Sequence, residues 1–147
     1  MTHVAEQVAQ DAVLGDLKTA WDADPTASTI VMLQDDRKGS KPGHDADGVP
    51  LPFARASIAH VDSDRECIGK PAKYDEEAIL TVQIFTPFGG ARDLGNTLVD
   101  LLRTTFRGSS NVSVRYKVIG PPIRVGETPD GYYQVNFPVV YGYFQEG

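Results

Sequence analysis

The chain has 147 residues, of which 41% are hydrophobic and 23% charged, and its formal net charge is −6. This length suits one domain over residues 1–147, and no apolar run reaches the roughly 18 to 20 residues that span a bilayer. The acidic balance excludes a generic nucleic-acid binder, which is usually basic. The single cysteine, Cys67, excludes a disulfide within the chain and a cysteine-based zinc site. Residues 1–16 are acidic and interrupted by polar residues, so we expect no secretory signal.

The negative charge is concentrated at the start of the chain. Residues 1–36 contain seven acidic residues and one basic residue, whereas residues 37–147 contain 13 of each. Residues 101–126 hold five basic residues and no acid. This separation favours a protein that meets other protein surfaces at two places. The alternative is a solvated acidic helix with ordinary scatter of charge elsewhere.

The first predicted element is a helix over residues 2–21, which ends before Asp24-Pro25. Its apolar stripe is expected to consist of Val4, Val8, Leu14, Leu17 and Trp21. Asp11 and Asp16 are then expected mainly on the outside.

A short strand at residues 30–33 and a long polar loop over residues 35–52 are expected next. The loop is rich in glycine, proline and charge, and connections of this length are usually functional or disordered. We interpret it as a loop that becomes ordered on binding. It contains Arg37, Lys38 and Lys41, for which lining a channel or reaching another protein are both open roles.

The middle of the chain predicts two strands and the best helix. Alternation predicts strands at residues 53–61 and 78–86, with Phe85 on the second face of the latter. The polar residues 62–77 are expected to be turn-rich, and the acidic run 75–77 indicates a solvated turn rather than catalytic carboxylates. Leucines and Phe106 at helical spacing predict an amphipathic helix over Ala91–Arg107.

The last third predicts strands at residues 112–118, 123–125 and 132–145, with a turn at 128–131. Pro138 cannot donate a ladder hydrogen bond, so the final strand should be an edge or be bulged there. The order of elements predicts an α+β fold: a mostly antiparallel sheet with an N-terminal helix and the helix Ala91–Arg107 packed on it.

No constellation for catalysis or ligand binding survives inspection. The glycine patterns of phosphate-binding loops are missing, and residues 44–48 lack two oxygen ligands of a calcium loop. His3, His44 and His60 have no spacing typical of a metal site, and His60 is expected to be a cross-strand polar residue. We therefore expect no catalytic, cofactor-binding or metal-binding residue.

Aromatic residues outside the predicted core indicate a protein interface. The final strand places Tyr132 and Phe144 on the face opposite its main apolar row. Aromatic residues in such positions commonly mark interfaces, and ordinary strand propensity is the alternative explanation.

Three segments together resemble the tail terminator proteins of long-tailed bacteriophages and of phage-derived tail-like or gene-transfer particles. They are PFARASIAHVDS, EEAILTVQIFTPFGGARDLGNTLVDLLRTTF and IGPPIRVGETPDGYYQVNFPVVYGY. The likeness runs over residues 53–144, with a looser match in the N-terminal helix, and it rests on architectural patterns rather than a chemical motif.

The resemblance implies a small α+β subunit of a hexameric ring that is made of copies of itself. Such a ring caps the tail tube protein, stops growth of the tube and provides the docking surface for the head connector. DNA passes through its channel without specific binding, and the protein resides in the virion after assembly in the bacterial host cytoplasm. No enzyme activity, cofactor or membrane contact is implied.

Two other interpretations stay open. One is another neck component, a head completion or head-to-tail adaptor protein, and the other is a small cytoplasmic enzyme or ligand-binding domain.

Under the ring interpretation, the acidic patch of one copy meets the basic patch of the next. The candidate interface residues are Asp11, Asp16, Arg37, Lys38, Lys41, Phe85, Arg103, Arg107, Arg115, Lys117, Arg124, Tyr132 and Phe144.

Overall fold

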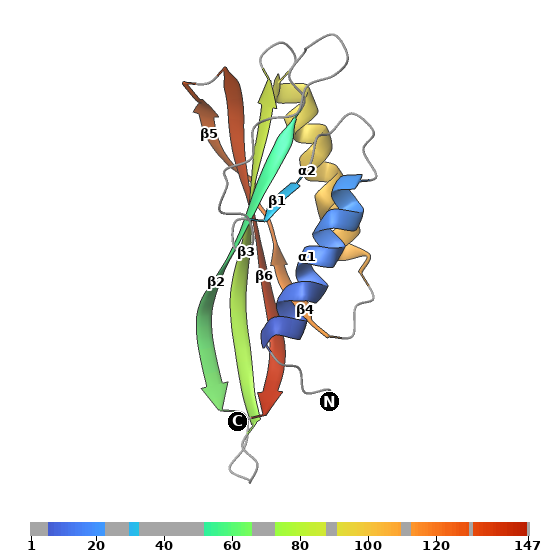
Figure 1. The fold of residues 1–147 in the computed structure, drawn as a ribbon, viewed down its shortest axis with the longest axis vertical. Helices are drawn as coiled ribbons and strands as arrows, with labels where there is room; N and C mark the ends of the chain where they lie inside the picture. Colours follow the sequence, from blue (N-terminus) through green and yellow to red (C-terminus); the bar gives the residue numbers. More distant parts are fainter. Residues whose placement is uncertain are drawn as a thin grey trace.

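Two helices cover one face of a six-stranded sheet and leave the other face without a helix (Figure 1). The computed structural model describes residues 6–22, 30–32, 52–65, 73–87, 91–109, 113–129 and 131–146. The elements are α1 (Glu6–Asp22), β1 (Ile30–Met32), β2 (Phe53–Arg65), β3 (Lys73–Pro87), α2 (Ala91–Arg107), β4 (Arg115–Ile119), β5 (Ile123–Glu127) and β6 (Tyr132–Glu146).

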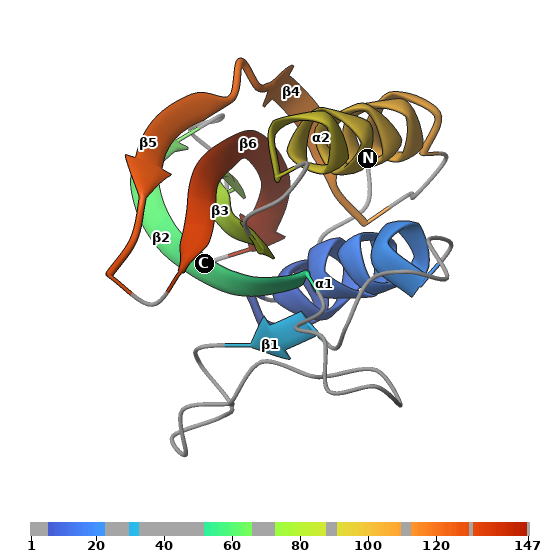
Figure 2. The same cartoon turned by 90° about the horizontal axis from the view of Figure 1, so that it is seen from above.

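The strand order is β1-β2-β3-β6-β4, and β5 also pairs with β6. β1 is parallel to β2, and every other pair is antiparallel. Seen from above, both helices lie on the same side of the strongly twisted sheet (Figure 2). The structure therefore confirms the α+β fold, and it confirms the bounds of the second helix.

The main core lies between the helices and the inner face of the sheet. Alternate residues of β3 and β6 point into it, among them Leu80, Val82, Phe137 and Tyr141, all fully buried. The helices supply the other layer of this core through Ala9, Val13, Leu17, Ala20, Trp21, Leu98, Val99, Leu102 and Phe106. The period of two along the strands and of about 3.6 along the helices brings the two apolar surfaces together.

The expected stripe of α1 is wrong in part. Val8 is exposed, and the buried residues in that region are Ala9 and Val13. Leu17 and Trp21 are buried as expected. The burial of Ala9 and Val13 together with Leu17 and Ala20 follows a helical spacing of three and four residues, so small side chains carry a face that large ones were expected to carry.

β2 and β3 extend further than predicted, because the polar residues 73–77 are part of a strand and not of a solvated turn. Asp75 pairs with Asp64, and Glu77 pairs with Asp62, after a bulge in β2 between His60 and Asp62. The strand continues through these polar positions because side chains on neighbouring strands satisfy them, as described below.

β6 lies in the interior of the sheet, and its register with β3 continues through Pro138 without a shift, so the expectation of an edge or a bulge at Pro138 is wrong. β3 flanks β6 along its whole length, and β4 and then β5 flank the other side. The ladder changes from β4 to β5 opposite Pro138, where Gly120 N donates to Pro138 O at 2.8 Å. In an antiparallel ladder both backbone groups of a residue point to the same neighbour, so the missing N–H of Pro138 points at this break.

Candidate subunit interface

The outer face of the sheet is built in rows across the strands. The register places Glu77 of β3, Gly142 of β6 and Arg115 of β4 in one row. A second row, nearer the middle of the sheet, consists of Ala59, Ile79, Val140 and Val118. The outer face is therefore ionic at the lower end in Figure 1 and aliphatic above it.

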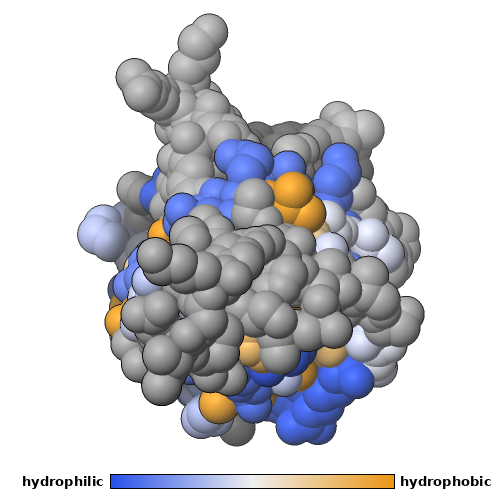
Figure 3. Space-filling model, turned by 90° about the horizontal axis from the view of Figure 1, so that it is seen from below, coloured by the Kyte–Doolittle hydropathy of each residue, from blue (hydrophilic) through white to orange (hydrophobic). Residues whose placement is uncertain are grey.

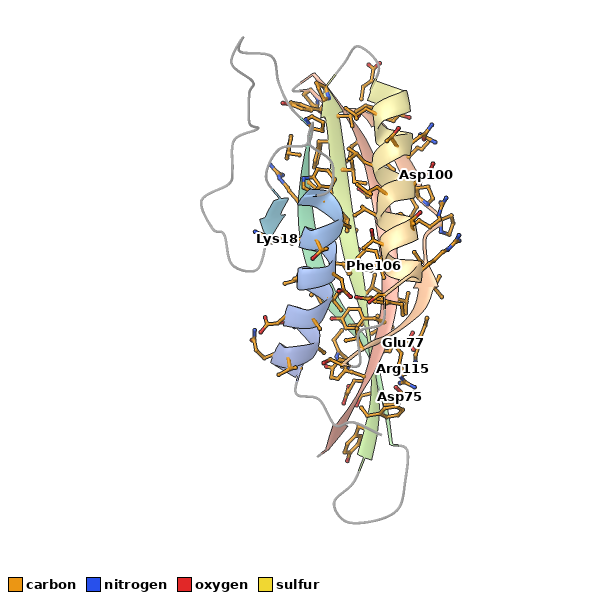
Figure 4. The ribbon with its side chains drawn as sticks, turned by 90° about the vertical axis from the view of Figure 1, so that its right-hand side faces the viewer. Lys18, Asp75, Glu77, Asp100, Phe106 and Arg115 are labelled. Atoms are coloured by element: carbon orange, nitrogen blue, oxygen red, sulfur yellow. The ribbon has the colours of Figure 1, made fainter. Side chains whose placement is uncertain are left out.

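Four charged residues at the lower end form one cluster, the ionic cluster, which consists of Asp75, Glu77, Arg115 and Lys117. Arg115 Nη2 lies 2.7 Å from Asp75 Oδ1. Lys117 Nζ lies 3.0 Å from Glu77 Oε2 and 3.7 Å from Asp75 Oδ2. Figure 4 shows Asp75, Glu77 and Arg115 close together in this part of the molecule. Two bases of β4 thus neutralise two acids of β3 across the intervening strand β6.

Gly142 is what lets these side chains cross β6. A Cβ at this position would lie 2.8 Å from Lys117 Cε and 3.3 Å from Arg115 Nη2. Any other residue would fill the space that the two basic side chains occupy. The glycine therefore makes the contact between β4 and β3 possible.

Phe144 lies beside the ionic cluster and packs against it. The guanidinium carbon of Arg115 is 3.9 Å from the centre of the Phe144 ring, a cation–π contact. Phe144 does lie on the outer face, as its position in the strand predicted, and within the monomer its ring already has a partner.

A separate aromatic cluster lies at the upper end of the outer face. It consists of Phe53, Phe85 and Tyr132, all between 6 and 9% exposed. Phe53 stacks on Phe85 with ring centres 4.6 Å apart, and Tyr132 meets Phe53 edge-on at 5.2 Å. Arg55 lies over both phenylalanine rings at 5.8 and 5.5 Å. Phe85 and Tyr132 are therefore buried in the monomer, where they fill a second small core.

Asp16 was expected mainly on the outside, but it is half-buried, because it ties α1 to the start of β4. Ser109 Oγ donates to Asp16 Oδ2 at 2.9 Å, and the Tyr116 hydroxyl donates to the same oxygen at 2.5 Å. Burial and the hydrogen bond to Asp16 raise the pKa of Tyr116 well above its usual range. The carboxylate of Asp16 therefore already has hydrogen-bond partners within the chain.

Two further tyrosines line the inner face near this tie. Burial raises the pKa of Tyr141 well above its usual range. Burial, together with the negative charges of Glu6 and Glu76, raises the pKa of Tyr143 to about 12. Both hydroxyls therefore stay protonated in the folded protein at neutral pH.

His60 and the buried Glu76 form a third polar contact on the inner face. His60 Nε2 lies 3.1 Å from Glu76 Oε2, and Ser63 Oγ donates to Glu76 Oε1 at 2.7 Å. His60 is thus a cross-strand polar residue, as predicted. The contact explains how an acid can lie on the core side of β3.

The remaining predicted charges lie on the helices and on β5. Asp11 is exposed on α1 and accepts a hydrogen bond from Gln7 Nε2 at 2.9 Å. Arg103 pairs with Asp100 on the same helix at 3.3 Å, and Figure 4 shows Asp100 on the outside of α2. Arg107 is exposed in the last turn of α2.

Arg124 projects from β5 toward α2. Its Nη2 donates to Asn96 Oδ1 at 2.7 Å, although its side chain remains largely exposed. Arg37, Lys38 and Lys41 lie outside the residues that the structure describes, as does most of the predicted polar loop. The structure therefore brings together Arg115, Lys117 and Phe144, and it separates them from the aromatic cluster and from Asp16.

Sequence reasoning missed the acidic half of the ionic cluster and the glycine that it needs. Asp75 and Glu77 are in phase with Ile79 and Thr81, so the alternation of β3 does extend to them. The alternation was visible in the sequence, but we expected the strand to begin at Ala78, so Asp75 and Glu77 were assigned to a turn. Gly142 had no signal in a single sequence.

Sequence reasoning also missed the exposed aliphatic residues. Among the described residues, five large hydrophobic side chains are exposed: Val8, Val61, Val118, Ile123 and Val125. Val61 lies on β2, and three of the others lie on β4 and β5, at the opposite side of the strand order. Seen from below, hydrophobic atoms form small separate groups among hydrophilic ones on the described surface (Figure 3). The exposed aliphatics therefore belong mainly to the two edges of the sheet.

The described part of the chain contains no group of three or more histidine, cysteine or acidic residues that could hold a metal ion. None of its helices combines the length and apolarity that crossing a membrane requires.

No protein-family profile matches this chain, and no curated protein sequence matches it. Several solved structures are similar to it, and one of them, of a protein whose name states no function, has a TM-score of 0.61. That similarity covers 95% of each chain at 16% sequence identity. At this identity the likeness shows a shared fold and nothing more.

Proposed function

We propose that this chain is a structural subunit that forms a ring at the end of a phage or phage-like tail tube, where it terminates the tube and provides the joining surface for the head. The resemblance over residues 53–144 supports this proposal. Its two most specific parts, the unit from β3 to α2 and the closing strand β6, are the elements around which the sheet is organised.

The observation that carries the proposal is the exposure of aliphatic residues at both edges of one sheet. Val61 is exposed on β2, outside the residues that pair with the described strand β1, and Val118, Ile123 and Val125 are exposed at the other side of the strand order. Exposed apolar residues at sheet edges attract other chains unless a partner covers them. A subunit with two different apolar edges can contact one neighbour on each side, which is the arrangement that builds rings.

The charge of the chain suits the passage of DNA. A ring of identical subunits multiplies the net charge of −6 that each copy carries. Negative charge around a channel would repel phosphates and let the duplex slide without specific contacts. The proposed partners are therefore further copies of this chain, the tube protein and the head connector, and DNA passes through the channel without specific binding.

Deleting the gene from the particle that encodes this chain tests the proposal, with electron microscopy as the measurement. Loss of a tail terminator is expected to give overlong tails without heads, and a plasmid copy of the gene should restore normal length. Tails of normal length beside unstable full heads would instead indicate a head completion protein. Particles of normal appearance would contradict both roles.

A further inference from the structure

The edge formed by β4, β5 and the turn between them, residues 118–125, is unusually apolar for an exposed segment. Its sequence is VIGPPIRV, with Arg124 as the single charged residue. Val118, Ile123 and Val125 are 51 to 58% exposed, and Pro121 is also exposed. An exposed run of this kind is a folding liability unless it has a function. We call it the aliphatic edge.

The aliphatic edge cannot extend the sheet by a regular ladder. Pro121 and Pro122 have no N–H group to donate. The register of β4 shifts between Tyr116 and Val118, and that of β5 shifts between Arg124 and Gly126. Such bulges and prolines prevent edge-to-edge strand pairing. A partner on this edge must therefore bind through side-chain packing.

The other edge of the sheet offers a matching surface. Among the described residues, β1 pairs only with residues 54–56 of β2, so residues 57–65 are paired with β3 alone. Val61 is exposed at the bulge of this segment. In the sequence, residues 61–65 carry two aspartates and one arginine, a net charge of −1, whereas the aliphatic edge carries the single charge of Arg124. Each segment thus exposes aliphatic side chains, and the two sequences carry opposite net charge.

We propose that the aliphatic edge of one copy packs against the Val61 segment of β2 in the next copy, by side-chain contact and not by strand pairing. This inference rests on the ring-forming function proposed above and names its contact. Because the two patches differ, the contact is heterologous, and an open assembly of copies keeps one free patch of each kind at its ends until the ring closes. Because the sequences of the two segments carry opposite net charge, assembly should weaken as salt rises.

Two single variants and their mixture test the contact, with mass measured by light scattering after size exclusion. Ile123→Asp damages the aliphatic edge, and Val61→Asp damages the β2 patch. Each variant alone should run as a monomer of 16.0 kDa, because every contact needs one damaged patch. Mixed together, they should form 1:1 dimers and stop there, because each supplies the patch that the other lacks.

Val8→Asp is the matched control, since Val8 is similarly exposed but lies on helix α1 and on neither of the two segments. It should assemble as the unmodified chain does. At a protein concentration where the unmodified chain is monomeric, thermal unfolding of all three variants should match that of the unmodified protein, which shows that lost assembly is not lost folding.

Three results would overturn the inference. They are an unmodified chain that stays monomeric at high concentration, an Ile123→Asp variant that assembles as the unmodified chain does, and a Val61→Asp variant that dimerises by itself. The last result would indicate a symmetric contact of two aliphatic edges. The gene deletion gives an independent result. If the variants confirm the contact but the deletion leaves tails of normal length, the terminator function is contradicted and the contact is not. If the deletion gives overlong tails but Ile123→Asp still assembles, the contact is contradicted and the terminator function is not.

Discussion

The inner and outer faces of the lower sheet both carry polar residues, but they satisfy them in different ways. On the inner face, Tyr116 donates to the carboxylate of Asp16 in a part-buried site. On the outer face, Asp75 and Arg115 form an ion pair that remains accessible to solvent. A buried hydrogen bond is costly to break, whereas an exposed ion pair contributes little to stability.

The comparison shows that polar residues which sequence reasoning assigned to a partner are already used within the chain. Asp16, Arg115 and Lys117 all have intramolecular contacts. The aliphatic edge is the opposite case, because Val118, Ile123 and Val125 are exposed within the part of the chain that the structure describes. The proposed contact therefore rests on exposed apolar residues and not on the distribution of charge.

Alkaline pH should have the largest effect, and it acts on the inner face. Burial raises the pKa of Tyr143 to about 12 from an ordinary value of about 10. A raised pKa in the folded state stabilises the protein fully below pH 10, and this stabilisation is lost as the pH rises toward 12. Urea unfolding between pH 9 and 12 should show falling stability. Tyr143→Phe should show a weaker pH dependence, and an equal dependence would contradict this assignment.

Tyr116→Phe should lower the free energy of unfolding by about 1 to 3 kcal/mol, because it leaves a part-buried carboxylate with one donor fewer. Urea unfolding measures the change. Ser109→Ala removes the other donor to Asp16 and should have a similar direction. Unchanged stability in both variants would mean that water replaces the hydrogen bonds to Asp16. The hydrogen bonds to Asp16 would then contribute no more to stability than the ion pairs of the ionic cluster.

Gly142→Val should destabilise the protein by about 1 kcal/mol, because its side chain displaces Lys117 and Arg115 from the acids of β3. Thermal unfolding measures the effect. In a Lys117→Ala background the cost should become smaller, since one of the two displaced side chains is then missing. An equal cost in both backgrounds would show that the ionic cluster does not depend on this glycine.

Asp75→Asn should cost only about 0.2 to 1 kcal/mol, because the pairs of the ionic cluster are exposed to solvent. Raising the salt concentration should reduce the difference from the unmodified protein. Asp100→Asn on α2, which breaks a pair within one helix, serves as the control and should cost about 0.3 to 0.5 kcal/mol. A loss of about 3 kcal/mol in the free energy of unfolding of Asp75→Asn would contradict the difference in stability proposed between the inner and outer polar contacts.

Ile123→Ser should have the smallest effect on folding, within about 0.5 kcal/mol, because the side chain is exposed in the monomer. Unfolding at a protein concentration where the chain is monomeric measures this. A large loss there would show that the aliphatic edge stabilises the fold itself, which would contradict its role as a contact surface.

Periodicity along the chain was sufficient to predict the second helix and the alternation of the closing strand. Residues 91–107 and 132–145 each repeat apolar residues at the spacing of one structure, whatever lies around them. The first helix was predicted less well, because its buried face includes alanines that carry little hydrophobic signal. The strand ends were missed because polar residues in a strand resemble a turn when their partners are unknown.

The sequence by itself therefore determined the helices, the main strands and the face of each strand that meets the core. Only the tertiary structure decided which residues lie opposite one another on neighbouring strands, and therefore which charged side chains pair within the chain. Tyr116 is 100 residues from Asp16, and Lys117 is 40 residues from Glu77. Periodicity reports the face on which a side chain lies, but the neighbour across that face depends on strand order, and strand order follows from packing the whole chain.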